Sequence, residues 1–183
     1  MAVGTWQRWT ILFGLLAAIG AAPAPSEIHI SGSATRPSDW SVEQLQAQLA
    51  TEIKSVEYKS KGATHTFSCV PLVSVLKAAG VQTDFAMKGG KNPKVKNPQM
   101  RQAIVVSGRD GYTVVFSLAE ALPMVGNRAI WVALEEDGKP LSEADGPVRL
   151  IVPEDKMPAR GMHQVASIDV VELSASTTQP ASP

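Results

Sequence analysis

The chain has 183 residues, of which 44% are hydrophobic and 19% are charged. This composition fits one globular domain with short tails and excludes an intrinsically disordered protein. The 17 basic and 17 acidic side chains give a formal net charge of zero, which excludes general electrostatic attraction to nucleic acid or to an anionic membrane. Because Cys69 is the single cysteine, the chain cannot form an intramolecular disulfide.

Residues 1–25 are predicted to form a secretory signal peptide. Arg8 precedes an apolar run over 10–22, and this run is too short for a membrane-spanning helix, which needs ~20 apolar residues. We therefore expect cleavage near residue 25 and a periplasmic or secreted protein without a stable membrane span; an uncleaved anchor is the alternative. The signal has one arginine and no arginine pair, which predicts export of an unfolded chain.

After the predicted signal peptide, the sequence as far as residue 80 predicts a strand, a helix, a β-hairpin and a second helix. Alternating polar and apolar residues predict a strand over 27–32. Ser41 and Gln44 have the spacing of a capping box, so a helix is expected over 41–49. The segments 53–58 and 64–67 flank a turn at Lys61-Gly62 and predict a β-hairpin. A helix over 71–80 has proline in its first turn and Gly80 after its end.

The second half is richer in strands. A polar loop is expected over 82–101, followed by strands over 102–107 and 112–117 and a short helix over 118–122. Further strands are predicted over 128–134, 148–152 and 164–173, and a disordered Ser-, Thr- and Pro-rich tail over 174–183. The strands do not alternate with long helices, so the predicted fold class is α+β: a mixed β-sheet domain over 26–173 with a few short helices.

Several blocks of sequence, in a fixed order, resemble one known family. They are the segment 67–80, the Asp-Gly-Tyr segment 110–120, the turn 137–141, the segment 146–153 and the closing segment 158–170. Over 67–173 the chain resembles the oxidoreductase molybdopterin-binding domain family. The resemblance implies the sulfite-oxidase-type fold, molybdopterin as the cofactor and an oxidoreductase activity.

The resemblance also implies where a metal ligand should stand. Family enzymes hold molybdenum through a cysteine thiolate located a dozen residues or more before the segment that begins at 67. The corresponding stretch, 50–58, has no cysteine, and a soft metal centre prefers a thiolate to a hydroxyl. No metal site is therefore predicted. Cys69 precedes a predicted helix, so it is either a reactive thiol or a small buried apolar residue.

Four further residues have roles that the resemblance implies. Arg160 and His163 match the basic cluster that binds the pterin phosphate, and Asp110 and Tyr112 would shape the edge of the pocket. A guanidinium is well suited to bidentate phosphate binding. Alternatively, Arg160 is a surface charge and His163 a histidine at a sheet edge. The loop 87–101 carries five basic residues and no acidic one; it either binds an anion or an acidic partner, or is a solvated loop.

Two functional hypotheses follow. The first is a molybdopterin-binding oxidoreductase domain, in which Arg160, His163, Asp110, Tyr112 and Cys69 would contact the cofactor. The second is a non-catalytic module of the cell envelope that uses the cofactor cleft or the lysine-rich loop for a small anion or a protein partner. The missing cysteine and the export route favour the second, without bound molybdopterin.

Overall fold

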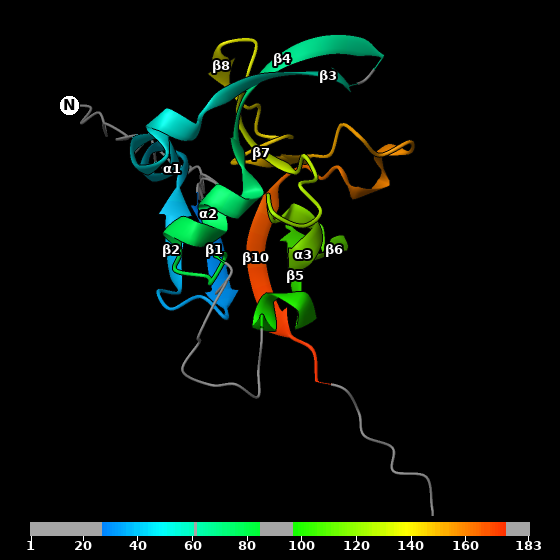
Figure 1. The fold of residues 1–183 in the computed structure, drawn as a ribbon. Helices are drawn as coiled ribbons and strands as arrows, with labels where there is room; N and C mark the ends of the chain where they lie inside the picture. The colour runs from blue at the N-terminus through cyan, green and yellow to red at the C-terminus, as the bar shows by residue number, and fades with distance from the viewer. Residues whose placement is uncertain (1–26, 61, 85–96, 175–183) are drawn as a thin grey trace, which may run out of the picture.

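The computed structural model describes residues 27–60, 62–84 and 97–174. The predicted signal peptide, the tail from residue 175 and the four lysines of the loop 87–101 lie outside the described residues, as does Lys61 of the predicted hairpin turn. The described part contains two β-sheets and a few short helices (Figure 1). The α+β class predicted from the sequence is confirmed.

The first sheet has five strands in the order β2-β1-β10-β5-β6. Its strands are β1 (Glu27–Gly32), β2 (Ser38–Ser41), β5 (Gln102–Gly108), β6 (Thr113–Ser117) and β10 (Val165–Glu172). β1 pairs with β10 in parallel and the other neighbours are antiparallel, so the sheet is mixed. Figure 1 shows β10 near the middle of the molecule, and in the sheet it lies between β1 and β5.

The second sheet contains the predicted hairpin. Its strands are β3 (Lys54–Ser60), β4 (Ala63–Pro71), β7 (Trp131–Glu136), β8 (Lys139–Pro140) and β9 (Arg149–Ile151). β3 pairs with β4, β4 with β7, and β7 with both β8 and β9, all antiparallel. The paired β3 and β4 project at one end of the molecule (Figure 1).

The helices are short and lie at the ends of strands. They are α1 (Val42–Gln48), α2 (Leu72–Ala78) and α3 (Leu118–Ala121), with 3-10 turns over Ala50–Glu52, Pro98–Arg101 and Pro158–Arg160. The capping box is present: the Gln44 backbone N–H donates to Ser41 Oγ over 3.3 Å, and the Ser41 N–H donates to Gln44 Oε1 over 2.8 Å. Among the described residues, no helix has the length and hydropathy needed to cross a membrane.

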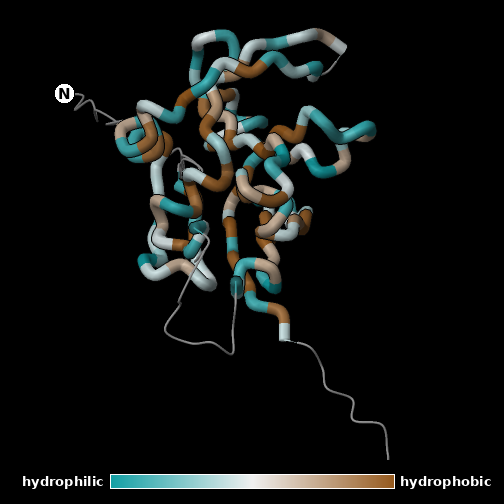
Figure 2. The backbone as a smooth tube through the Cα atoms, in the orientation of Figure 1, coloured by the Kyte–Doolittle hydropathy of each residue, from teal (hydrophilic) through white to brown (hydrophobic). Residues whose placement is uncertain are grey.

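The main hydrophobic core lies between the sheets and helices. It buries side chains from β1, β5, β10 and all three α-helices, including Ile30, Ile104, Ile168, Leu45, Leu76 and Leu118. Neighbouring residues of a strand point to opposite faces, so Val70, Val132 and Leu150 join this core while Cys69 and Ala133 point to the other face. Figure 2 shows hydrophobic and hydrophilic residues alternating along the strands.

The elements differ from the predictions mainly at their ends. β2 was not predicted, because its four residues, Ser-Asp-Trp-Ser, form a strand only by pairing with β1. The strand predicted over 128–134 begins at Trp131 and continues to Glu136, because β4 supplies hydrogen-bonding partners up to that point. These boundaries depend on pairing partners that are distant in the sequence.

Candidate functional site

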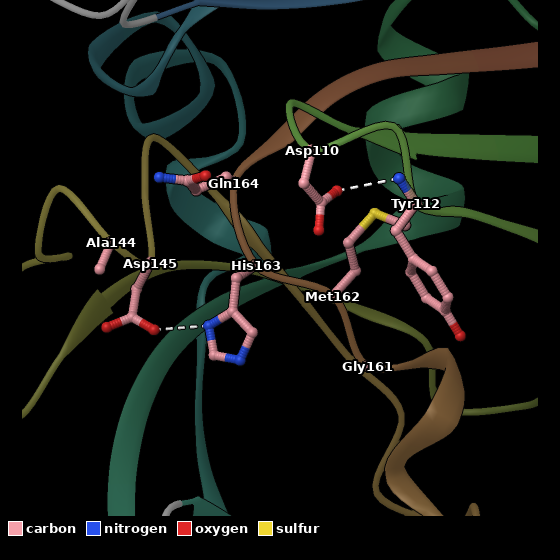
Figure 3. A pocket seen from close by; sticks show the side chains of 8 residues that line it. All are labelled: Asp110, Tyr112, Ala144, Asp145, Gly161, Met162, His163 and Gln164. Atoms are coloured by element: carbon pink, nitrogen blue, oxygen red, sulfur yellow. Dashed lines mark hydrogen bonds and ion pairs between the residues drawn. The ribbon is translucent and has the colours of Figure 1, made fainter.

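A cavity of about 420 Å³ lies between the turn that joins β5 to β6 and the segment that precedes β10. Figure 3 shows its lining residues, which come from three loops. The lining residues are Asp110, Tyr112, Ala144, Asp145, Gly161, Met162, His163 and Gln164. Three residues that the sequence assigned to the site, Asp110, Tyr112 and His163, therefore meet at this cavity.

The turn before β6 positions two of these side chains. Gly111 adopts a φ of 83°, a left-handed conformation that glycine tolerates without steric cost. The Tyr112 backbone N–H donates to Asp110 Oδ1 over 2.9 Å, and the Tyr112 hydroxyl donates to the Ala159 carbonyl over 2.7 Å. The second bond ties the turn to the segment on the other side of the cavity, so the tyrosine ring has a defined position at its rim.

Asp145 and His163 form a hydrogen-bonded pair in the cavity wall. Asp145 Oδ1 lies 2.5 Å from His163 Nδ1, and the Ser142 hydroxyl donates to Asp145 Oδ2 over 2.6 Å. The carboxylate side chain is only 5% exposed, whereas the imidazole is 42% exposed. In Figure 3 the second imidazole nitrogen points away from Asp145, so this pair presents one ring nitrogen for a further contact. Sequence reasoning missed Asp145, because a loop aspartate before Gly146-Pro147 carries no spacing signal.

Arg160 does not line the cavity. Its Nε donates to Asp155 Oδ2 over 2.8 Å, one Nη donates to Asp155 Oδ1 over 2.6 Å, and the other donates to Glu120 Oε1 over 2.9 Å. The guanidinium also stacks 4.7 Å from the centre of the Phe116 ring. The hydrogen bond from Arg160, with further support from Arg128, lowers the pKa of Asp155. A carboxylate thus already occupies the bidentate geometry that suits a phosphate.

Cys69 lies inside the second sheet, where it packs with Phe67, Ala133 and Ile151 and has no exposed surface. Burial raises the pKa of the Cys69 thiol to about 12, and the opposing effect of the Arg149 charge is smaller. A thiol needs its anionic form to act as a nucleophile or metal ligand. This geometry corresponds to the small buried residue of the two alternatives that the sequence left open.

Arg149 is a second feature of this region that sequence reasoning missed. It is only 5% exposed, and its guanidinium lies 5.7 Å from the Tyr58 ring centre and 5.3 Å from that of Phe67. The buried Nε of Arg149 has no hydrogen-bond partner within the described part of the chain. In the sheet register Ala133 pairs with both Cys69 and Arg149, so these two residues occupy one cross-strand row. The sequence shows only an arginine between the apolar residues of a strand.

The mixed first sheet, the antiparallel second sheet and the short helices define a small α+β domain with a polar cavity at the edge of its first sheet. The chain matches the oxidoreductase molybdopterin binding domain family over residues 19–179. The protein therefore belongs to this family, as the resemblance implied. A comparison with curated proteins found no match.

The fold is similar to that of a solved enzyme. The chain aligns with the crystal structure of the sulfane dehydrogenase SoxCD from Paracoccus pantotrophus with a TM-score of 0.58 and 15% sequence identity. The alignment covers 85% of this chain and 40% of the SoxCD chain. At this identity the likeness establishes a shared fold, and function must be argued from the site.

The residues do not fit a molybdenum-bearing cofactor. The only thiol of the chain, Cys69, is fully buried among apolar side chains and does not line the cavity, so it offers no accessible sulfur donor to a metal held there. Arg160 is bound to two carboxylates, and the cavity wall contributes two more, Asp110 and Asp145, which disfavour a phosphate. Arg149 is a buried cation beside the thiol, but it lies in the packed face of the sheet and does not line the cavity.

Proposed function

We propose that this protein is an exported, non-catalytic binding module that keeps the molybdopterin-oxidoreductase scaffold and holds no molybdenum centre. One observation carries the proposal: the single thiol, Cys69, is buried in an apolar cluster with its pKa raised to about 12. The signal-like segment 1–25 supports export. Its single arginine agrees with a chain that crosses the membrane before it could fold around a cofactor.

The binding site in this proposal is the cavity beside Tyr112 and His163. Asp145 holds one imidazole nitrogen, which leaves the other to hydrogen-bond a ligand. The aromatic ring of Tyr112 adds an exposed apolar surface at the rim. A few polar groups that converge on a concave space are the usual arrangement for a small-molecule site. The sequence left a small anion and a protein partner as alternatives; of these, the concave cavity favours a small molecule over a protein.

Metal and pterin analysis of the full chain purified from the exported fraction tests the proposal. We expect neither molybdenum nor pterin. Stoichiometric molybdenum in the wild-type protein, lost in Cys69→Ala, would overturn the proposal and assign the thiol as a ligand. Cell fractionation in the same experiment tests export, because recovery only from the cytoplasm contradicts that part of the proposal.

Ligand binding at the cavity needs a separate test. We would screen a panel of small carboxylic acids, amines and phosphates for a rise in the melting temperature, since a ligand that binds only the folded state stabilises it. A hit should be weakened by His163→Ala and unaffected by His29→Ala, which removes a histidine outside the cavity. A hit that both variants leave unchanged would place binding elsewhere.

The redox activity of the family is the second candidate, and the match over residues 19–179 favours it. This activity would require the buried Cys69 thiol to reach a metal. The metal analysis above decides between the two candidates.

A further inference from the structure

Three potential metal ligands meet at the end of β7, outside the cavity. His65 lies in β4, Glu136 is the last residue of β7, and Asp137 begins the turn into β8. The strand pairing brings them together, because Phe67 pairs with Glu136 and the Asp137 N–H donates to the Thr66 carbonyl over 2.7 Å. Figure 1 shows β8 close to the hairpin of β3 and β4.

The spacing of the donor atoms suits one metal ion. His65 Nδ1 lies 2.8 Å from Asp137 Oδ2 and 3.1 Å from Glu136 Oε1, and the three donor atoms lie within 4.8 Å of one another. A tetrahedral ion with bonds of ~2.0–2.2 Å places its ligand atoms roughly 3.3–3.6 Å apart. Small side-chain rotations would therefore be enough to bring all three atoms to one ion.

Neighbouring groups hold two of the ligands in place. The Thr66 backbone N–H donates to Asp137 Oδ1 over 2.9 Å, which leaves Oδ2 directed at the imidazole. The His65 ring packs 6.3 Å from the Phe67 ring centre. Hydrogen bonds to the non-ligating atom of a metal ligand orient it and strengthen metal binding.

The arrangement is electrostatically incomplete without a cation. Two carboxylates beside one imidazole carry a net negative charge whichever way the imidazole is protonated. His65 Nδ1 faces both Glu136 Oε1 and Asp137 Oδ2, and among the described residues the Glu136 carboxylate has no other hydrogen-bond or ion-pair partner. Lys139 is near enough to act on Asp137, but it makes no ion pair with it. A divalent ion between the three donor atoms would offset this negative charge.

We propose that His65, Glu136 and Asp137 form a binding site for a divalent transition-metal ion, with zinc as the best fit. One imidazole and two carboxylates suit zinc, whereas magnesium and calcium prefer sets made only of oxygen ligands. The half-buried His65 and Glu136 and the exposed Asp137 leave water to complete the coordination shell. The proposal does not depend on the ligand of the cavity.

Titration of the chelator-treated full chain with Zn²⁺, followed by calorimetry, tests the site, and Co²⁺ provides a spectroscopic probe of tetrahedral geometry. We expect one ion per chain, and His65→Ala and Asp137→Asn should each weaken binding at least about tenfold, the scale seen when support of a metal ligand is lost. His29→Ala is the matched control, because His29 also pairs with an aspartate, Asp39 at 2.7 Å, but has no third ligand among the described residues.

The His29→Ala control distinguishes a metal site from an ordinary histidine–aspartate pair. His29→Ala should bind Zn²⁺ as the wild type does. The proposal is overturned if Zn²⁺ does not bind, or if His65→Ala and His29→Ala lower the affinity equally. Circular dichroism of each variant establishes that a loss of binding is not a loss of folding.

Discussion

Asp155 receives two parallel hydrogen bonds from Arg160, one from Nε over 2.8 Å and one from an Nη over 2.6 Å. Arg128 adds a third hydrogen bond to the same carboxylate, over 2.7 Å. Asp155 is largely buried, with its side chain 10% exposed. The pairing ties the segment before β10 to the loop before β7, and it occupies the arginine that the family resemblance assigned to a cofactor phosphate.

The Asp155→Asn variant should unfold more easily than the wild type. The substitution removes charge-assisted hydrogen bonds to two arginines, and such bonds contribute about 1.5–3 kcal/mol, so we expect a loss of that size in the free energy of unfolding. Urea unfolding measures it. Asp39→Asn, at an exposed pair with His29, should change the stability by less than about 0.5 kcal/mol.

The stabilisation by Asp155 should decrease as the pH falls. The pKa of Asp155 is lowered in the folded state, so its contribution is complete above the unfolded-state pKa of about 4. The contribution is lost as the pH falls through the lower folded-state pKa. The difference in stability between wild type and Asp155→Asn should therefore shrink in acid. A difference that grows below pH ~4 would contradict this assignment.

Cys69 should be inert to thiol reagents in the folded protein. Its pKa of about 12 and its complete burial leave almost no accessible thiolate at about pH 8. A chromogenic disulfide reagent should react stoichiometrically only after denaturation. Fast labelling of the folded protein would show that the thiol is accessible.

Substitution of the same cysteine should distinguish an apolar from a polar environment. Cys69→Ser places a hydroxyl in the cluster with Phe67 and Ile151, and an unpaired buried hydroxyl costs about 1–3 kcal/mol. Cys69→Ala removes only one atom and should cost about 1 kcal/mol. Equal stability of the serine variant and the wild type would mean that the site is polar.

Alanine substitutions at Gly32 and Gly138 should distinguish destabilisation by steric contact from destabilisation by backbone strain. Both have a positive φ, of 79° and 73°. A Cβ on Gly32 would lie 2.1 Å from the Val170 carbonyl oxygen, whereas one on Gly138 would meet no atom within 4 Å. Gly138→Ala should cost about 1–2 kcal/mol from the left-handed conformation alone. Gly32→Ala should cost more than that in thermal unfolding, because β1 must move away from β10; equal losses would contradict the close approach.

Arg149 provides a test of a buried guanidinium with an unsatisfied nitrogen. The Arg149 Nε has no hydrogen-bond partner in the part of the chain that the structure describes, and the guanidinium carbon lies 5.7 Å from the Tyr58 ring centre and 5.3 Å from that of Phe67. Arg149→Met keeps an unbranched chain against the rings and removes the charge, so it should be neutral within about 1 kcal/mol or stabilising. Arg149→Ala leaves a cavity and should cost about 2–4 kcal/mol. A loss in Arg149→Met as large as that in Arg149→Ala would show that the charge itself is needed, because the methionine keeps most of the volume.

The amino-acid sequence alone determined the local features of this protein. The capping box at Ser41 and Gln44, the hairpin of β3 and β4, and the apolar strand β5 follow from short-range patterns of side chains and turn residues. The order of the matched blocks also determined the family, and the absence of a cysteine over 50–58 is a property of the sequence itself.

Only the tertiary structure decided how the charged side chains are used. Asp155 comes close to Arg160, Asp145 to His163, and Asp137 to His65, and the last pair is 72 residues apart in the chain. Hydrogen bonds and burial depend on distances of a few ångströms, which loop conformation sets for the first two pairs and the pairing of β4 with β7 sets for the third. For the same reason the sequence left the state of Cys69 open, while its packing against Ala133 and Ile151 determined it.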